Sequence, residues 1–367
     1  MQIVFFVNII RQARCIRRIQ DFINRGYNTK IFGFDRHGDN RSIPLFPHEI
    51  IGQIHSTSSY FQRMRMMCSA INSVLKSQDR NAVFYIFSLD VAIAYILAGG
   101  LKYKYIYEVS DLMELEVNNK ILSRVLVSIN RFIIKHSIET IMTSLGFAKY
   151  YFGENIPSYI YILPNKLDRS VLSLPRPEAR VFNSQNISIG FTGAIRNKSI
   201  YQFINVVGNY FPNIRLHFYG IFTDDKVYGE KIRNSIEKFD NVEYLGPFNN
   251  PQDFPEIYSH IDLVLCLYTD KGNDRVLEPN KLYEALFYEK PIIVSKSTFT
   301  GDYVDRCGIG YTVCGENPDD IISLLKSITD EDYYEKVYRC SLIPKEESVD
   351  NTDDFFIKLV QTLHCYE

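Results

Sequence analysis

The chain has 367 residues, of which 46% are hydrophobic and 23% are charged, a balance typical of globular proteins and unlike that of disordered or fibrous chains. This length favours two domains over one. The seven cysteines include no CxxC pair, which argues against a zinc site or an extracellular disulfide framework and favours reduced thiols.

Charge is divided unevenly along the chain. Residues 1–165 hold 19 Lys and Arg against 12 Asp and Glu, a net +7, and residues 166–367 hold 22 against 31, a net −9, which together give the formal charge of −2. We expect the basic half to meet something anionic. Because no run of Lys and Arg is interleaved with aromatic residues, nucleic acid is not expected as a partner.

The apolar stretches are too short to span a membrane. Residues 1–7 are of strand length with no cleavage-site pattern after them, and the apolar run over residues 91–97 is far below the roughly 20 residues of a spanning helix. We therefore expect a cytoplasmic protein. A basic helix, described below, suggests that it also attaches to the inner face of the cytoplasmic membrane.

In the first half, short apolar runs alternate with amphipathic patterns. A helix is predicted over residues 14–24, where apolar side chains recur on one helical face. Near-continuous apolar strands separated by helices predict a parallel sheet covered on both faces. The predicted strands are residues 3–7, 30–34, 83–87, 103–109, 140–144 and 159–163.

The second half repeats this scheme, so the fold class is α/β with two doubly wound, Rossmann-like domains that face a cleft. Helical patterns follow at residues 200–210 and 281–288. The predicted strands are residues 187–193, 214–220, 242–246, 263–268, 291–295 and 310–313. The expected organisation is an N-terminal domain over 1–167, a polar linker over 168–186, a C-terminal domain over 187–345, and a final helix over 346–367.

A candidate anion site lies in the stretch Pro279-Asn280-Lys281-Leu282-Tyr283-Glu284. Pro279 suits either a turn or the first helical position, and Asn280 is a candidate cap. The N-terminus of a helix attracts phosphate through its free N–H groups. Lys281 would be unfavourable there unless an anion is present, and Glu284 can accept hydrogen bonds from ribose hydroxyls. From spacing alone, an ordinary solvated surface helix accounts for the pattern equally well.

This stretch, with Lys290-Pro291 after it, resembles the donor-binding motif of GT-B glycosyltransferases of the family-four type, P-x-K-L-x-E followed by K/G-P. The resemblance implies that Glu284 holds the nucleotide ribose and that the helix N-terminus with Lys281 approaches the diphosphate. Many members carry an additional glutamate before this one. Here Val276 stands eight positions before Glu284, and Asp274 or Glu278 are the candidates to replace it.

Further segments match the same family in order and spacing. Gly193 ends the strand that would open the second domain, and Arg196 and Lys198 follow it as expected diphosphate contacts. Ordinary loop charges are the alternative for these two cations. Gly220 and Gly246 end the next two strands, near the expected place of the base. The segment 163–168 resembles the end of the family's first domain, and the resemblance implies that the helix 346–367 crosses back to it.

In the first domain, Glu108 and Asp111 stand at the end of a predicted strand and are candidates for a general base, needed only if the enzyme inverts configuration. Asp111 equally suits the cap of a following helix. The first loop has no Gly-rich fingerprint, so no dinucleotide is expected there. Arg14 and Arg17 are the residues expected to touch the acceptor.

Residues 120–135 combine a basic face with apolar side chains. Their four cations have spacings of four, seven and four, with no acidic residue between Glu116 and Glu139. This pattern suits contact with anionic lipid headgroups at a membrane surface. A core helix with a solvated basic face is the alternative.

Neither a metal nor a cofactor is expected. The seven histidines show no HxxxH or HxE spacing, and GT-B enzymes stabilise the leaving diphosphate with a helix dipole and cations. The resemblance therefore implies a glycosyltransferase that moves a sugar from a nucleotide diphosphate sugar, expected to be a UDP-sugar, to a saccharide or lipid-linked saccharide in the synthesis of capsule, O-antigen or another surface polysaccharide. A UDP-sugar epimerase of the same fold and a non-catalytic partner in a polysaccharide-synthesis complex are the alternatives.

Overall fold

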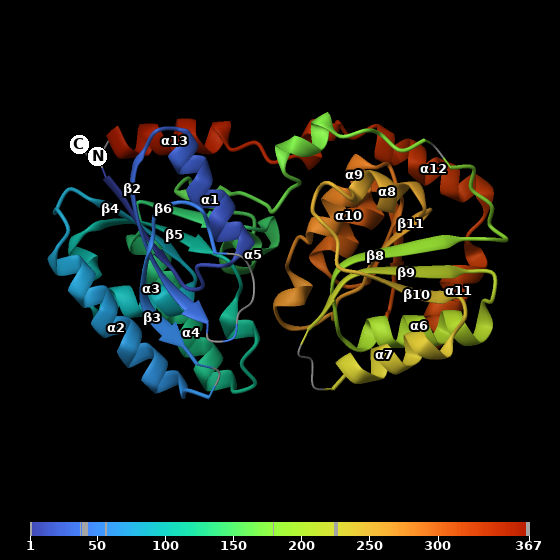
Figure 1. The fold of residues 1–367 in the computed structure, drawn as a ribbon, viewed down its shortest axis with the longest axis horizontal. Helices are drawn as coiled ribbons and strands as arrows, with labels where there is room; N and C mark the ends of the chain where they lie inside the picture. The colour runs from blue at the N-terminus through green and yellow to red at the C-terminus, as the bar shows by residue number, and fades with distance from the viewer. Residues whose placement is uncertain are drawn as a thin grey trace. The chain divides into compact units, whose positions relative to one another are not determined.

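The computed structural model describes residues 2–36, 38, 43–55, 57–178, 180–223 and 227–364. The chain divides into two compact units, the first made of residues 1–164 and 352–367 and the second of residues 165–351. Each unit is built around one parallel sheet, as the alternation of apolar runs and helical patterns predicts (Figure 1). None of the described helices combines the length and the apolar character that crossing a membrane requires.

Unit 1 contains a seven-stranded sheet in the order β3-β2-β1-β4-β5-β6-β7, in which every pair of neighbours is parallel. Its strands are β1 (Gln2–Val7), β2 (Asn28–Arg36), β3 (Glu49–Ile54), β4 (Val83–Phe87), β5 (Lys104–Val109), β6 (Glu139–Met142) and β7 (Ile160–Ile162). Its α-helices are α1 (Ala13–Asn24), α2 (Tyr60–Lys76), α3 (Leu89–Leu97), α4 (Lys120–His136), α5 (Leu145–Phe152) and α13 (Asp353–His364), with short 3-10 helices η1 (Gly100–Lys102) and η2 (Met113–Leu115).

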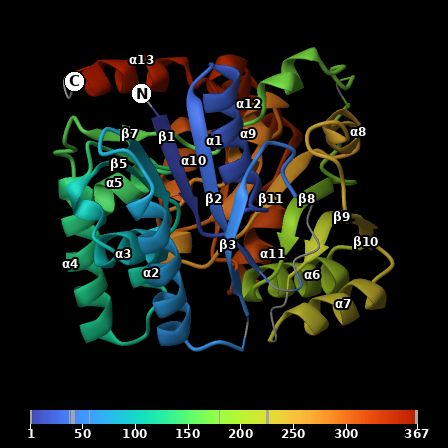
Figure 2. The same cartoon turned by 60° about the vertical axis from the view of Figure 1, so that its left-hand side comes forward.

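Helices cover both faces of this sheet. α1 and α13 pack on one face, where the ring of Phe22 lies 4.8 Å from that of Phe356 in an edge-on arrangement. α2, α3 and α4 lie on the other face, as the turned view in Figure 2 shows. The C-terminal helix therefore completes the core of the unit that the N-terminus begins.

Unit 2 contains a six-stranded parallel sheet in the order β10-β9-β8-β11-β12-β13. Its strands are β8 (Ser188–Ile195), β9 (Arg215–Phe222), β10 (Val242–Gly246), β11 (Leu263–Cys266), β12 (Ile292–Ser295) and β13 (Gly310–Val313). Its α-helices are α6 (Lys198–Tyr210), α7 (Gly229–Lys238), α8 (Phe254–Ser259), α9 (Asn280–Phe287), α10 (Phe299–Cys307), α11 (Pro318–Ser327) and α12 (Asp330–Ser341), with 3-10 helices η3 (Arg169–Ser173), η4 (Gly272–Arg275) and η5 (Lys345–Ser348).

Two hydrophobic clusters sandwich the second sheet. One gathers α6, α7 and α11, and the other gathers α8, α9 and α10. The segment expected as a linker, residues 168–186, lies within unit 2. Val171 is 1% exposed in the second cluster, and Leu167 pairs with Val349 in an isolated parallel bridge.

Candidate donor site and the acceptor-side cluster

Two glycines face each other near the carboxyl ends of β8 and β9 in unit 2, two residues before each strand ends. Gly193 and Gly220 are partners in the strand register, with φ of +112° and +140°. A Cβ atom added to Gly220 would lie 1.8 Å from the carbonyl oxygen of Gly193, and one added to Gly193 would lie 3.3 Å from Nζ of Lys281. Only glycine fits both positions. Because Gly193 has no side chain, the space beside the Lys281 ammonium stays open.

The helix α9 begins at the same place, directly after Pro279. Pro279 is the N-cap and provides no side-chain cap, and Asn280 is the exposed first residue of the helix. The prediction that Asn280 caps the helix is therefore wrong, because the chain enters the helix one residue earlier. Without a side-chain cap in the described residues, the first turn can offer its N–H groups to an anion.

Lys281 is buried, with 7% of its surface exposed. Its Nζ lies 4.3 Å from the centre of the Phe191 ring and 5.8 Å from that of Tyr268. Burial lowers the pKa of Lys281, but Tyr268, Cys266 and the Glu284 carboxylate together outweigh burial and hold the pKa above its ordinary value. Lys281 is thus a permanent cation at neutral pH, kept in place by aromatic rings.

Glu284 lies one turn further along α9 and is 5% exposed. Its Oε2 accepts one hydrogen bond from Thr192 Oγ1 and one from the Tyr258 hydroxyl, each at 2.6 Å. Burial, followed by the Glu284 carboxylate, raises the pKa of Tyr258 well above its ordinary value, so this hydroxyl stays a donor. In the described part of the chain both bonds fall on Oε2, which leaves Oε1 to accept from a ligand hydroxyl.

Thr192 and Tyr258 were not found from the sequence. Thr192 precedes Gly193 at the strand end, which is a usable signal, whereas Tyr258 lies in α8 and resembles an ordinary core residue. Leu282, also predicted at the donor site, is 3% exposed and packs in the hydrophobic cluster of α8, α9 and α10.

The two other predicted cations lie between β8 and α6. Arg196 is exposed directly after β8. Lys198 is the first residue of α6, and its Nζ lies 2.9 Å from Glu316 Oε2, an ion pair that competes with any contact to a ligand. Asn197 between them has φ of +75° and caps α6 by accepting from the Ile200 N–H at 3.0 Å.

Two features belong to the outer part of the predicted donor site. Gly246 ends β10 at φ +83°, with open space around the position of a Cβ. Asp274 lies in η4, where its Oδ2 accepts from the backbone N–H and the hydroxyl of Thr269, both at 3.3 Å. These bonds fix the loop that precedes α9.

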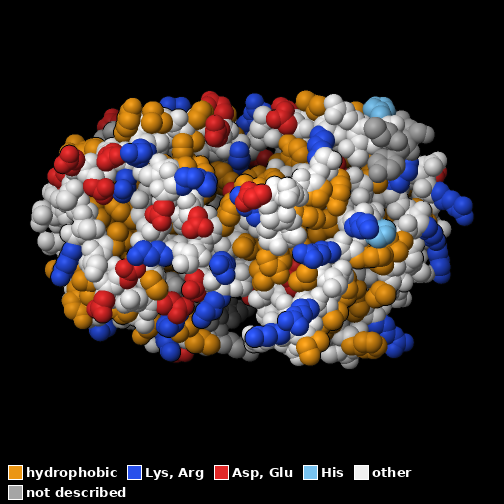
Figure 3. Space-filling model, turned by 180° about the vertical axis from the view of Figure 1, so that it is seen from behind, with side chains coloured by type: hydrophobic (Ala, Val, Ile, Leu, Met, Phe, Trp, Pro, Cys, Tyr) orange, Lys and Arg blue, Asp and Glu red, His pale blue; other side chains and the backbone are white. Residues whose placement is uncertain are grey.

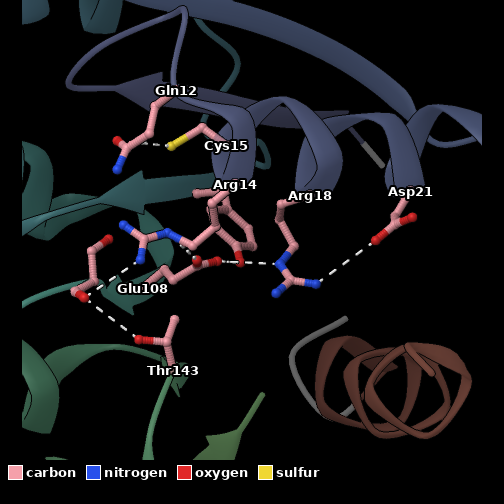
Figure 4. Close-up of polar contacts among 9 residues, drawn as sticks. Gln12, Arg14, Cys15, Arg18, Asp21, Glu108 and Thr143 are labelled. Atoms are coloured by element: carbon pink, nitrogen blue, oxygen red, sulfur yellow. Dashed lines mark hydrogen bonds and ion pairs between the residues drawn. The ribbon is translucent and has the colours of Figure 1, made fainter. Parts of the chain in front are cut away.

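In unit 1, Glu108 is the centre of a buried ionic cluster. Arg14 and Arg18 reach toward it from α1 (Figure 4). Arg18 Nε donates to Glu108 Oε2 at 3.3 Å, Tyr85 donates its hydroxyl to the same oxygen, and Arg14 Nε lies 3.7 Å from Oε1. Glu108 has no exposed surface. This position argues against the predicted role as a base, because the carboxylate is enclosed by its own partners.

The neighbouring residues are placed differently. Asp111 is exposed just after the end of β5. Arg14 Nη1 donates to the carbonyl of Ser110 at 3.5 Å, while its Nε and Nη2 are buried without a hydrogen-bond partner in the described residues. Arg17 is half-buried, and Arg18 is an interior residue. Arg14 thus stands at the carboxyl ends of β1 and β5, the edge of a doubly wound sheet where ligands bind.

No group of three or more His, Cys, Asp and Glu side chains within the described ranges is arranged to hold a metal ion.

Comparisons with known proteins bear on both units. Residues 186–330, which include α9, β8 and β9, match the model of the family described as Glycosyl transferases group 1. The succinoglycan biosynthesis protein ExoL of Rhizobium meliloti is 23% identical over 381 residues, covering 96% of this chain and 91% of that protein.

Solved structures match the whole chain. Sucrose-phosphate synthase from Thermosynechococcus elongatus has a TM-score of 0.71 at 12% identity, covering 100% of this chain and 99% of the other. The Anabaena protein Alr3699/HepE, solved with UDP and glucose, has a TM-score of 0.70 at 12% identity, covering 98% and 99%. These likenesses confirm the expected two-domain architecture.

Proposed function

We propose that this chain, a glycosyltransferase of the GT-B fold, moves a sugar from a UDP-sugar to a saccharide or lipid-linked saccharide in the synthesis of a surface polysaccharide. The observation that carries the proposal is the arrangement of Glu284, Lys281 and the Gly193–Gly220 pair at one end of the second sheet. It combines an oriented carboxylate, a buried cation and an uncapped helix N-terminus.

Each part of this arrangement suits one part of a nucleotide diphosphate. Glu284, oriented by Thr192 and Tyr258, accepts hydrogen bonds from the vicinal ribose hydroxyls through Oε1. The Lys281 ammonium and the N–H groups of the first turn of α9 bind the diphosphate. Gly193 lets the phosphates approach the backbone. Arg196 is placed to add a second cation from the β8–α6 loop.

The choice of donor and pathway is supported by relatives. The Anabaena protein was solved with UDP-glucose as well as with UDP, and the lipopolysaccharide outer core galactosyltransferase WaaB matches with a TM-score of 0.59 at 14% identity. ExoL acts in succinoglycan biosynthesis by its name. A UDP-sugar donor and a polysaccharide product are the simplest assignment consistent with these names and with the site.

In the reaction, the bond between the anomeric carbon and the diphosphate oxygen breaks while an acceptor hydroxyl oxygen bonds to that carbon. Lys281 and the α9 N-terminus stabilise the negative charge that grows on the departing diphosphate. The acceptor hydroxyl loses its proton. For an inverting reaction, exposed Asp111 is the proposed base, and buried Glu108 serves to orient Arg14. A retaining reaction needs no carboxylate base, because the departing diphosphate oxygen can accept that proton.

Arg14 and Arg17 are the proposed acceptor contacts in unit 1. Arg14 Nη2 is buried without a hydrogen-bond partner in the described residues, and such a donor suits a hydroxyl or phosphate oxygen of a saccharide carrier. The Glu108 carboxylate orients the Arg14 guanidinium through Nε, which lies 3.7 Å from Oε1.

We also propose that α4 contacts the cytoplasmic face of a membrane. Ile121 is 73% exposed, and the same helix exposes Leu122, Val125 and Phe132 together with Lys120, Arg124 and Lys135. In Figure 3, basic and apolar side chains intermix over unit 1, whereas acidic side chains gather over unit 2. Exposed apolar and basic residues on one helix are the combination that binds anionic lipid surfaces.

The donor assignment is tested by thermal shifts with UDP-, GDP-, ADP- and CMP-sugars on the wild type and on Glu284→Ala. A UDP-sugar should stabilise the wild type, and the variant should lose most of the shift. Glu237→Ala, an exposed glutamate of α7, is the matched control and should respond as the wild type does. If no nucleotide stabilises the wild type, or Glu284→Ala responds equally, the donor site is wrongly assigned.

Turnover distinguishes the remaining alternatives. Incubation with the UDP-sugar that binds best and a membrane extract should release UDP and label the saccharide fraction. Release of a UDP-sugar epimer instead would identify an epimerase. Binding without either product, across extracts that support known transferases, would favour a non-catalytic partner.

A further inference from the structure

Unit 2 contains a cavity of about 310 Å³ at the end of the sheet opposite the donor site. Its wall includes Phe287, Tyr288 and Lys290, which follow α9 and precede β12. The donor residues stand at the carboxyl ends of β8 and β9, whereas this cavity adjoins the amino end of β12. Because all strands of the sheet are parallel, the carboxyl ends of β8 and β9 and the amino end of β12 lie at opposite ends of the sheet. The cavity is therefore separate from the proposed nucleotide site.

Lys290 gives the cavity its chemistry. The residue is 7% exposed, and no hydrogen bond or ion pair of its ammonium occurs within the described ranges of the chain. Burial lowers the pKa of Lys290, and Asp262 and Glu289 offset this only in part. The acid that acts most strongly on Lys290 is Asp262. Its Oδ2 accepts from the Ser188 N–H at 2.7 Å, and its Oδ1, which has no hydrogen-bond partner among the described residues, lies 3.5 Å from Arg180 Nε. A buried cation without a hydrogen-bonded partner is energetically costly. An anionic ligand that binds Lys290 would offset this cost.

The other polar groups of the wall agree with an anionic ligand. Four cations line the cavity, Arg176, Arg180, Lys290 and Lys345, against two carboxylates, Glu178 and Glu289. The Glu289 carboxylate is neutralised by Lys345, whose Nζ lies 2.8 Å from its Oε1. Arg180 is likewise paired with Asp262, at 3.5 Å, so Arg176 and Lys290 remain against one carboxylate, Glu178. Because the residues from 166 onward carry a net −9, this excess of one cation is a local reversal of charge.

A second unused group lies in the same wall. The Tyr288 hydroxyl is buried and has no hydrogen-bond partner among the described residues. Burial raises the pKa of Tyr288, and the Glu284 carboxylate adds to this, so the group stays protonated. Tyr333 and Tyr334 supply further aromatic surface, and the Tyr334 hydroxyl accepts from the Phe182 N–H at 3.1 Å. The wall thus joins a cation to aromatic side chains.

We propose that this cavity is a second ligand site, which binds a small phosphate-bearing molecule through Lys290. A volume of about 310 Å³ is at the lower end of small-molecule sites and suits a phosphate group with a single sugar ring better than a nucleotide sugar. The phosphate oxygens accept charge-assisted hydrogen bonds from Lys290, and the sugar ring lies along the tyrosines. This ligand has no part in the proposed transfer reaction.

The test is a calorimetric titration of the full chain with a hexose phosphate, with saturating UDP present to fill the donor site. Inorganic phosphate and glucuronate are titrated in parallel, so that a free anion and a carboxylate are distinguished from a phosphorylated sugar. The variant is Lys290→Met, and the matched control is Lys296→Met, which removes an exposed lysine paired with Asp320.

We expect the hexose phosphate to bind the wild type and Lys296→Met equally and to bind Lys290→Met at least about tenfold more weakly. Thermal unfolding checks the fold, and the melting temperature of Lys290→Met should not fall, because the variant removes a buried unpaired cation. Absence of binding by either phosphate, or equal binding by Lys290→Met, would overturn the proposal. Preference for glucuronate over both phosphates would also overturn it.

Discussion

The hydroxyl of Tyr258 donates a 2.6 Å hydrogen bond to Oε2 of Glu284, across 26 residues of sequence. The bond joins α8 to α9 and fixes the direction in which the carboxylate presents its other oxygen. The glutamate is thus held in place by α8 as well as by its own helix before any nucleotide arrives.

Replacing Tyr258 with Phe should weaken donor binding without abolishing it. Loss of one hydrogen bond to a carboxylate costs about 1.5–3 kcal/mol, so the dissociation constant for the UDP-sugar should rise roughly tenfold or more, as measured by calorimetry. Tyr103→Phe removes a comparable buried bond, from its hydroxyl to the Leu75 carbonyl at 2.8 Å in unit 1. That control should leave affinity unchanged; equal losses in both variants would assign Tyr258 to the fold alone.

Replacing Lys281 with Met should lower kcat by about 100-fold, the scale of losing one charge-stabilising group in a transition state. Folding stability in urea should fall modestly as well, because a pKa held above its ordinary value means that the charged lysine stabilises the fold. Burial acts to lower the pKa of Lys281, but Tyr268, Cys266 and Glu284 raise it above 10.5. The lysine therefore stays charged as pH rises to 9, and UDP affinity should show no loss from Lys281 between pH 6 and 9. A Lys281→Met enzyme with unchanged kcat contradicts the proposed role.

Replacing Gly220 with Ala should disrupt the donor site and the sheet together. The new Cβ would lie 1.8 Å from the Gly193 carbonyl oxygen at φ +140°, so the strands must separate, at a cost of several kcal/mol by the scale of strain and overpacking. Gly246→Ala shares the positive φ, +83°, but meets open space, and should cost only about 1–2 kcal/mol. Chemical denaturation of both variants makes the comparison, and similar losses would mean that close approach is unimportant.

Replacing Glu108 with Gln should act on stability first. The change leaves Arg14 and Arg18 facing a neutral group inside unit 1, and breaking a buried ion pair costs about 3–5 kcal/mol. Asp111→Asn, at an exposed site, should leave the melting temperature unchanged while lowering kcat if the reaction inverts. A Glu108→Gln protein of wild-type stability would show that the cluster carries little folding energy.

The buried thiols should resist alkylation. Burial raises the pKa of Cys15, Cys266 and Cys340 to about 12 in each case, so at pH 8 only about one molecule in ten thousand carries the thiolate. Cys314 is exposed and should be labelled first by iodoacetamide. Peptide mass spectrometry locates the label, and early modification of Cys266 would indicate that unit 2 opens readily.

Much of this fold follows from short-range pattern. Buried parallel strands are continuous apolar runs, and Gly193 and Gly220 stand near the ends of two such runs. The strands and the donor motif can therefore be predicted without knowledge of the tertiary contacts. β3 was missed because Glu49–Ile54 mixes polar and apolar residues, as an edge strand with an exposed face permits. No apolar run identifies such a strand.

The partners of the site residues depend on distant sequence. Thr192 and Glu284 are 92 residues apart, Lys198 and Glu316 are 118 apart, and Arg18 and Glu108 are 90 apart. The enclosure of Glu108, and with it the loss of its predicted role, follows only once the sheet has brought α1 over β5. The charges and the local residue spacing do not predict that α1 packs over β5.

The packing of α13 on α1 has a consequence for how the chain is made. Residues 352–364 complete the core begun by residues 2–164, so unit 2 is topologically an insertion within unit 1. A ribosome that synthesises the chain from its N-terminus releases every residue of unit 2 before the last helix of unit 1 appears. The first unit to be started is therefore the last to be finished, and a fragment that ends at residue 164 leaves Phe22 without the rings of Phe355 and Phe356 that pack on it.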